Sequence, residues 1–179
     1  RSSFPDAPRD QSQPTRRSNP MSEIPVIVKR HLQAQVIKPI YDEMAAAFGA
    51  EKAKAILDSA IRKAAIAEGK EFAAKAPGGA TSMQGFIDLY KHWKADGALE
   101  VEGLAADDDR FDFNVTRCRY AEMYREMGLH DIGALLSCNR DGTFCEGYDP
   151  AITLDRSQTI MGGASHCTFR YRYDGPKRT

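Results

Sequence analysis

The sequence predicts an α+β fold in which N-terminal helices pack on an antiparallel sheet with inserted short helices. Two observations support this class. Apolar residues of the first half recur at helical spacing, whereas apolar and polar residues alternate after Ala98, which is the period of a strand. Helices that precede strands along the chain are typical of α+β proteins.

Helices are expected over most of residues 28–95. Between Val28 and Phe48, apolar side chains recur every four residues and form a helical row: Leu32, Val36, Ile40 and Met44. Pro39 interrupts this row, so a kink or a break is expected near Lys38. Two further helices are predicted, an alanine-rich one over 50–76 that ends at Pro77-Gly78-Gly79, and one over 83–95 that Thr81 or Ser82 caps.

Strands and short helices alternate in the second half. Residues 98–104 and 111–115 alternate apolar and polar side chains, which predicts a hairpin around the acidic turn between them. After Val115 the spacing of the apolar residues changes from that of a strand to that of a helix. Short helices are expected from Cys118 to Gly128 and from a cap at Asp131 to about Cys138, followed by a polar, turn-rich stretch. The last strands are predicted at 151–154 and 166–173.

The composition indicates one domain. The chain has 179 residues, of which 42% are hydrophobic, and this is enough for a sizeable core. Residues 1–20 hold four of the nine prolines and no apolar segment, so they are expected to be a disordered leader or cloning remnant ahead of Met21. A single α+β domain is predicted for residues 21–179.

The charge balance narrows the class of partner. The 25 basic and 25 acidic residues cancel, which argues against nucleic-acid and membrane-surface binders, because both need a net basic face. The chain has no apolar run of about 18 residues that would cross a membrane. A small-molecule substrate and a cytoplasmic location are expected, and a homo-oligomer is left open.

All four cysteines lie within residues 114–173, where chemically reactive side chains are densest. Their spacing contains no CxxC pair, so free thiols are expected, with no metal and no cofactor. Cys138 is the first candidate nucleophile, because it is predicted to lie where a helix gives way to a polar loop. There Asn139 is a candidate oxyanion donor, and Arg140 is expected to lower the pKa of the thiol.

The other cysteines are weaker candidates. Cys118 is expected inside a helix, where no free backbone N–H group stabilises a thiolate. Cys167 is expected on a strand, where it packs in the core or lines a pocket wall. The alternative for all of them is that free cysteines are small buried apolar residues.

Carboxylates and arginines close to these cysteines complete the candidate site. Glu122 follows Cys118 by one helical turn, so both lie on one face, and Glu122 or Asp141 is a candidate proton carrier. Arg140 and Arg156 are candidates to bind a substrate carboxylate with two parallel hydrogen bonds. The alternative is that these residues form ordinary surface ion pairs.

The second half resembles a known family. The runs C-R-Y-A-E-M-Y-R-E-M-G, L-L-S-C-N-R-D and E-G-Y-D-P-A-I-T-L-D-R-S-Q-T-I-M-G-G-A-S-H-C-T-F-R-Y are similar to the L-2-amino-thiazoline-4-carboxylic acid hydrolase family, over about residues 28–173. The resemblance implies a hydrolase-like domain that opens the thiazoline ring of a cyclic isothiourea and gives a carbamoyl-cysteine.

The resemblance also implies which positions belong to the site. They are Cys118, Cys138, Cys167, Glu122, Asp141, Arg156 and Thr159, to which Asn114 and His166 are added as candidate substrate-binding residues. The family commonly has Asp where this chain has Thr168, and a substrate contact there would imply a different substrate.

Two functions are therefore expected as alternatives. In the first, water or a cysteine thiolate adds to the sp2 carbon of a small cyclic amidine or amide, and the ring opens at a C–N or C–S bond. In the second, the chain is a non-catalytic small-molecule-binding domain, because the final segment also resembles the 4-vinyl-reductase type of domain.

Overall fold

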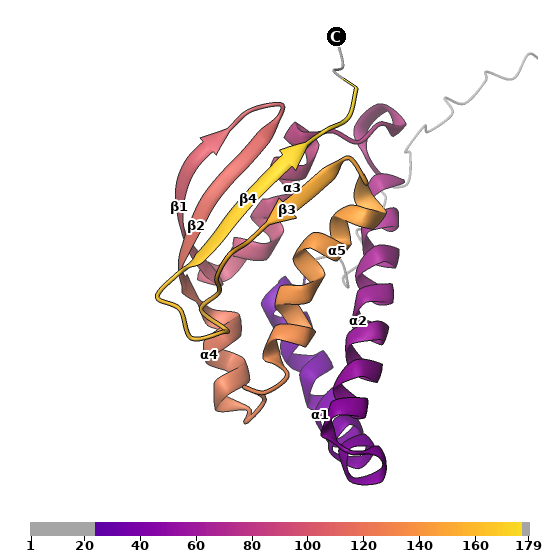
Figure 1. Ribbon diagram of the computed structural model, residues 1–179. Coiled ribbons are helices and arrows are strands. Elements are labelled where there is room, and N and C mark those ends of the chain that lie inside the picture. The colour runs from indigo at the N-terminus through magenta and orange to yellow at the C-terminus, as the bar shows by residue number, and fades with distance from the viewer. Residues whose placement is uncertain (1–23, 177–179) are drawn as a thin grey trace, which may run out of the picture.

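The computed structural model describes residues 24–176 and confirms the α+β class (Figure 1). The predicted leader over residues 1–20 lies outside the described residues. The described elements are α1 (Val26–Phe48), α2 (Ala50–Ala73), α3 (Met83–Lys94), β1 (Leu99–Ala106), β2 (Arg110–Cys118), α4 (Arg119–Glu126), α5 (Asn139–Tyr148), β3 (Ile152–Asp155) and β4 (Cys167–Tyr173). Within these residues, every helix is too short or too polar to cross a bilayer.

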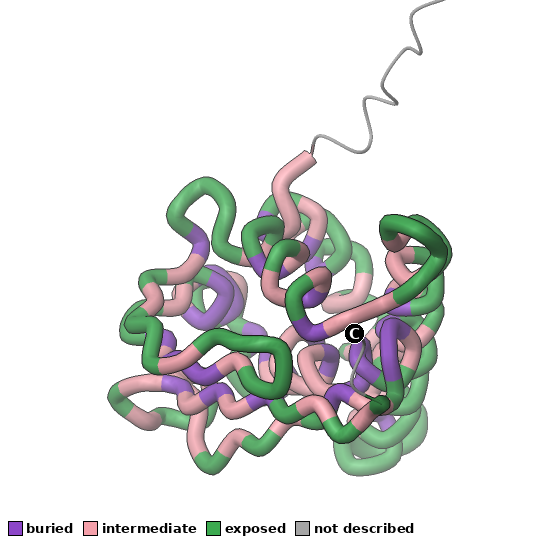
Figure 2. The backbone as a smooth tube through the Cα atoms, turned by 90° about the horizontal axis from the view of Figure 1, so that it is seen from above, coloured by how far each residue is buried: buried purple, intermediate pink, exposed green. Residues whose placement is uncertain are grey.

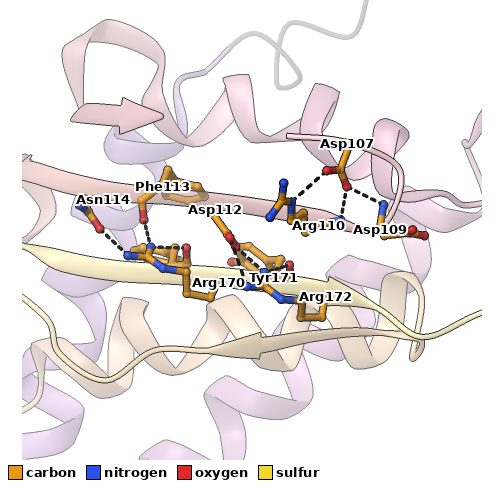
Figure 3. A network of polar contacts seen from close by, with 10 residues as sticks. Asp107, Asp109, Arg110, Asp112, Phe113, Asn114, Arg170, Tyr171 and Arg172 are labelled. Atoms are coloured by element: carbon orange, nitrogen blue, oxygen red, sulfur yellow. Dashed lines mark hydrogen bonds and ion pairs between the residues drawn. The ribbon is translucent and has the colours of Figure 1, made fainter. Parts of the chain in front are cut away.

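The strands form one antiparallel sheet in the order β1-β2-β4-β3. β1 and β2 are the predicted hairpin, and β4 returns to pair with β2, so that Phe113 lies opposite Phe169 and Phe111 opposite Tyr171. Because side chains alternate between the two faces of a strand, this register gathers aromatic rings on one face. The other face is charged, and Figure 3 shows Arg172 of β4 reaching Asp112 of β2 there.

The aromatic face of the sheet packs against α3 and α5. The rings of Phe86 and Tyr90 in α3 lie 4.8 Å from Tyr171 and 4.6 Å from Phe113, measured between centroids. Ser82 caps α3 as predicted, since its hydroxyl accepts a hydrogen bond from the N–H of Gly85 at 3.0 Å. Buried segments lie inside the molecule, and the outer sides of the long helices are exposed (Figure 2). The sheet and these two helices therefore enclose one aromatic core.

A second core joins the N-terminal helices to the segment around α4. Its buried members include Ile27, Leu57, Tyr124, Ile132 and Leu136. α1 and α2 form an antiparallel pair, and α4 lies beside α1 (Figure 1). This core therefore ties the helical half of the chain to the half that carries the cysteines.

The apolar row of α1 faces solvent. Leu32, Val36 and Ile40 are 51%, 63% and 53% exposed, and the residues that α1 buries are Ile27, Arg30 and Ala34. The helix is also continuous through Pro39, so of the kink or break predicted near Lys38, the break does not occur. Pro39 is exposed, and the carbonyl of Gln35 that loses its usual donor lies on the same side of the helix. Water can therefore replace the missing hydrogen bond.

The stretch predicted as a polar loop after Cys138 is helical. A π-helical turn over Ala134–Cys138 continues directly into α5, and no side chain caps its start, so Asp131 is not the predicted cap. Gly142 and Gly147 made this stretch look rich in turns, because glycine is a poor helix former. α5 forms nevertheless, because Thr143, Phe144, Cys145 and Tyr148 are buried by it. Tertiary packing thus overrides local propensity.

Two glycines allow α2 and α5 to touch. A Cβ atom added at Gly147 would lie under 3.0 Å from the carbonyl oxygen of Ile66, and one added at Gly69 would lie under 3.0 Å from that of Phe144. Real Cβ atoms essentially never approach a backbone atom so closely, and backbone cannot move aside as a flexible side chain can. Glycine is therefore required at both positions.

We expect Gly147→Ala to lower the free energy of unfolding by about 3 kcal/mol, because the new methyl group forces α2 and α5 apart. Gly142→Ala is the matched control in the same helix. Its Cβ would meet Leu154 at 3.7 Å, an ordinary contact, so the change should be neutral or stabilise the protein by up to about 1 kcal/mol. Urea denaturation of both variants measures the difference, and equal stabilities would contradict the close contact.

Candidate functional site

A cavity of about 80 Å³ lies between the aromatic face of the sheet and the helices, and it is several times larger than one water molecule needs. Three of the four cysteines line it: Cys118, Cys138 and Cys167. Cys145 is buried outside this lining, and its thiol contacts the carbonyl of Asp141 at 3.5 Å. All four are free thiols. The fold thus brings together cysteines that are far apart in the sequence.

Two of the three thiols lie at the end of a strand, and the third lies where the π-helical turn joins α5. Cys118 is the last residue of β2 and directly precedes α4. The prediction that it lies inside a helix is therefore wrong. Cys138 ends the π-helical turn, and Cys167 begins β4, where its Cα pairs with Val115 of β2. The sulfur of Cys167 accepts a hydrogen bond from the backbone N–H of Ile160 at 3.2 Å.

Burial keeps these thiols protonated at neutral pH. It raises the pKa of Cys118 to about 11, although the backbone N–H groups of Tyr120 and Ala121 lower it in part. Burial also raises the pKa of Cys138 to about 12, and the charge of Asp141 adds to this effect. The pKa of Cys167 is raised by burial too, but the N–H of Ile160 and the charge of Arg156 oppose the rise. Of the three cysteines, Cys167 is therefore the one whose thiolate is best stabilised by its neighbours.

An ion pair joins Asp141 to Arg156 at the cavity. Nη1 of Arg156 lies 2.5 Å from Oδ2 of Asp141, and its Nη2 donates to the carbonyl of Cys138 at 2.8 Å. The guanidinium also lies 5.1 Å from the ring centroid of Phe169. Burial raises the pKa of the Asp141 carboxyl, whereas Arg156 lowers it. A carboxyl with a raised pKa is a stronger base than an exposed one, so it is suited to accept a proton and return it during a reaction.

A second charged group comes from the helical half of the chain. Oε2 of Glu68 in α2 lies 2.6 Å from Nη2 of Arg140 and 3.1 Å from Nη2 of Arg30. Burial raises the pKa of Glu68, but the two guanidinium groups outweigh it and the pKa is lowered. Together with Asp141 and Arg156, three guanidinium groups and two carboxylates line the cavity, an excess of one positive charge.

Aromatic rings form most of the remaining wall. They are Phe86, Tyr90, Trp93, Tyr120, Phe144, Phe169 and Tyr171. The cavity therefore has a charged end and thiol groups set against an apolar surface. Such a mixture of apolar wall and few polar groups is typical of a small-molecule site.

Six of the sequence-predicted site residues meet at this cavity: Cys118, Cys138, Cys167, Arg140, Asp141 and Arg156. Two expected roles do not fit their contacts. The Asn139 amide donates to Asp58 at 2.7 Å, on the α2 side, so it is not available as an oxyanion donor. Arg140 pairs with Glu68, and burial, not a neighbouring cation, dominates the pKa of Cys138.

The other four predicted residues lie elsewhere. Glu122 is on the surface, 2.8 Å from Nε of Arg117, and this hydrogen bond lowers its pKa, which is the wrong direction for a proton donor. Asn114 lies on the charged outer face of the sheet, where Arg170 donates to it at 3.0 Å (Figure 3). Thr159 accepts from Gly162, and His166 contacts Gln158 and Ser165, all away from the cavity lining.

Thr168 also faces away from the cavity. It is adjacent to Cys167 on β4, so its side chain points to the opposite face, where its hydroxyl accepts a hydrogen bond from the N–H of Ser157 at 3.1 Å. The departure from the family's Asp at this position therefore gives no reason to expect a different substrate.

Arg30, Glu68 and Tyr90 are cavity residues that the sequence prediction missed. A signal for Arg30 exists in retrospect, because it lies three residues after Ile27 and four before Ala34, on the buried face of α1. A charged residue on a buried helical face needs a partner, and this marks it as part of a site or an internal ion pair. Within residues 24–176, no group of three or more His, Cys, Asp or Glu side chains is placed to share a metal ion.

Two solved structures are similar to this chain in part. The phenol-responsive sensory domain of the transcription activator PoxR with phenol is 13% identical, with a TM-score of 0.49, covering 77% of this chain and 73% of that one. Trafficking protein particle complex subunit 3 from Naegleria fowleri, covalently bound to palmitic acid, is 12% identical, with a TM-score of 0.47, covering 85% and 99%.

No curated protein matches the chain. A family match covers most of it, however, and spans every cavity residue named above, from Arg30 to Tyr171. The match over residues 29–171 shows that this chain belongs to the L-2-amino-thiazoline-4-carboxylic acid hydrolase family.

Proposed function

We propose that the chain is a hydrolase that opens a small cyclic amidine or amide bearing a carboxylate, as the family name suggests. The observation that carries the proposal is the meeting of three thiols with Asp141 and Arg156 in one cavity. Nucleophile, proton carrier and cation are the parts that such a ring opening needs.

The reaction adds one water molecule across a ring bond. The nucleophile bonds to the sp2 ring carbon, and Asp141 takes its proton. The tetrahedral intermediate then breaks its C–N or C–S bond, and Asp141 returns the proton to the leaving nitrogen or sulfur. In the direct route water is the nucleophile. In the covalent route a cysteine sulfur attacks first, and water displaces it after the ring has opened.

Cys167 replaces Cys138 as our first candidate for the covalent route. Its sulfur accepts the hydrogen bond from Ile160, which favours the thiolate, whereas burial raises the pKa of the Cys138 thiol to about 12 although Arg156 lowers it in part. Arg30 and Arg140, which share Glu68, are positioned to attract the substrate carboxylate.

A binding domain without turnover is the second candidate. The raised thiol pKa values favour it, because a protonated thiol is a poor nucleophile. The aromatic wall is equally suited to hold a ligand without chemistry. Incubation of the protein with 2-amino-thiazoline-4-carboxylate, with product analysis by mass spectrometry, distinguishes the two candidates, because only the hydrolase yields the ring-opened carbamoyl amino acid.

We expect Cys167→Ser to lower kcat at least about a hundredfold, because a serine hydroxyl in the same place is a far weaker nucleophile. Cys145→Ser is the matched control, since Cys145 lies outside the cavity lining, and it should keep kcat within about threefold. Steady-state turnover of purified variants measures both. Loss with Cys138→Ser or Cys118→Ser alone would assign the nucleophile to that thiol, and full activity in all three variants would establish the direct route.

We expect Asp141→Asn to lower kcat/KM at least about a hundredfold and to remove the acidic limb of the pH profile. Asp141 must be ionised to accept a proton, so activity is lost as pH falls through its pKa. Burial raises that pKa despite Arg156, Arg30 and Arg140, so the loss should occur above the pH at which an exposed Asp titrates.

The control for this experiment is Asp155→Asn. Asp155 is an exposed carboxylate next to Arg156 in the sequence, outside the cavity lining, so its removal should leave the pH profile unchanged. An Asp141→Asn protein that keeps the acidic limb would show that another group takes the proton.

A further inference from the structure

Two buried polar atoms at the cavity lack a hydrogen-bond partner among the described residues. They are Nε of Arg140 in α5 and the hydroxyl of Tyr90 in α3. Both residues are buried, with 8% and 9% of their surface exposed, and both line the cavity. Because buried donors in native proteins are nearly always paired, these two atoms point to a ligand with acceptors for them.

The charges at the cavity define one of these acceptors. Glu68 is shared between Arg30 and Arg140, and Asp141 is occupied by Arg156, so one positive charge is left over. A ligand carboxylate balances this excess, and its oxygen can accept from Nε of Arg140. The other end of the ligand is defined by the aromatic wall, where Phe86, Tyr90, Trp93 and Phe169 offer apolar surface that a compact, polar thiazoline carboxylate would leave unused.

We propose that the substrate is an aryl-substituted cyclic amidine or amide with a carboxylate. The carboxylate accepts from Nε of Arg140, a second acceptor on the ring meets the hydroxyl of Tyr90, and the aryl group lies against the aromatic wall. This inference rests on the proposed function, since it takes the ring opening as given and adds the substituent that the cavity selects.

A pair of substrates tests the inference directly. The full chain is supplied with 2-amino-thiazoline-4-carboxylate and with its 5-phenyl derivative, which share the reacting carbon and the carboxylate. The phenyl compound should have a kcat/KM at least about tenfold higher, because the ring buries its apolar surface in the cavity. Its 4-carboxamide analogue, which lacks the negative charge, should bind at least about tenfold more weakly by calorimetry.

Tyr90→Phe tests the second acceptor, because it removes the hydroxyl and keeps the ring. It should lower kcat/KM for the phenyl compound at least about tenfold, whereas Tyr173→Phe, a change at the outer end of β4, should not.

Equal or faster opening of the unsubstituted compound would overturn the inference and leave the hydrolase standing. Binding of the phenyl compound without ring opening of either would instead overturn the hydrolase and keep the ligand class. Both would be overturned if the phenyl compound neither bound nor reacted and the unsubstituted compound also stayed intact.

An independent observation concerns the outer face of α1. Val28, Leu32, Val36 and Ile40 are 42% to 63% exposed and follow one another at every helical turn. Single exposed apolar residues are normal, but a continuous row of this length marks an interaction surface. Charges of opposite sign flank the row at equal distances from Val36: Lys29 lies seven residues before it and Glu43 seven residues after it.

We infer that a second copy of the chain covers this row. When two α1 helices pack antiparallel about an axis at Val36, residues equally distant from Val36 face each other. Leu32 then meets Ile40 of the second copy, and Lys29 meets Glu43 of the second copy, so the apolar and charged residues both match their counterparts. The same row offered to an unrelated surface would gain nothing from this symmetry.

Sedimentation of the full chain should show a dimer at micromolar concentration. Val36→Glu should raise the dimer dissociation constant at least about tenfold, because it places two like charges on the axis, whereas Ile56→Glu, at an exposed apolar residue of α2, should not. Lys29→Glu should also weaken the dimer, and Lys29→Glu with Glu43→Lys should restore it. A monomeric wild type, or a dimer that Val36→Glu leaves intact, would overturn the inference.

Discussion

The contact between α2 and α5 is the constraint on which the cavity depends. Gly69 and Gly147 place no side chain between the two helices, so each backbone touches the other. Glu68 precedes Gly69, and the same contact brings its carboxylate within 2.6 Å of Arg140. Arg140 and Asp141 are adjacent residues of α5, so the position of Arg140 along the cavity also determines the position of Asp141. The distance between two helices thus sets the geometry of both charged groups.

Burial makes these charges costly unless each has a partner, and the fold provides partners from remote parts of the chain. Glu68 of α2 reaches both Arg30 of α1 and Arg140 of α5, while Arg156, which follows β3, reaches Asp141. Each pair restricts the motion of long side chains, so the donors are oriented before a ligand arrives. Preorganised charge of this kind lowers the reorganisation needed when a substrate binds, and it serves a binding domain as well as an enzyme.

The sequence predicted the strands and the first four helices close to their observed bounds, and it missed α5. Strands alternate with period two, so 98–104, 111–115, 151–154 and 166–173 were found close to their true positions. α5 was missed because its glycines lower local propensity, while the burial that stabilises it is a property of the tertiary structure. Residue type and family resemblance were enough to predict six of the cavity residues. They did not predict Arg30, Glu68 and Tyr90, because these residues lie in the helical half and approach the cysteines only after folding.

The environment of the thiols constrains the chemistry further. Burial already raises the pKa of Cys118 and Cys138, and a substrate carboxylate would add a negative charge that raises it more. A free thiolate is therefore unfavourable once substrate is bound, unless a cation offsets the charge. Arg156 does so for Cys138 and Cys167, and Asp141 lies at the same cavity to take the proton. Attack by sulfur and proton transfer to Asp141 must then occur together, which makes the carboxyl group as necessary as the thiol for a covalent route.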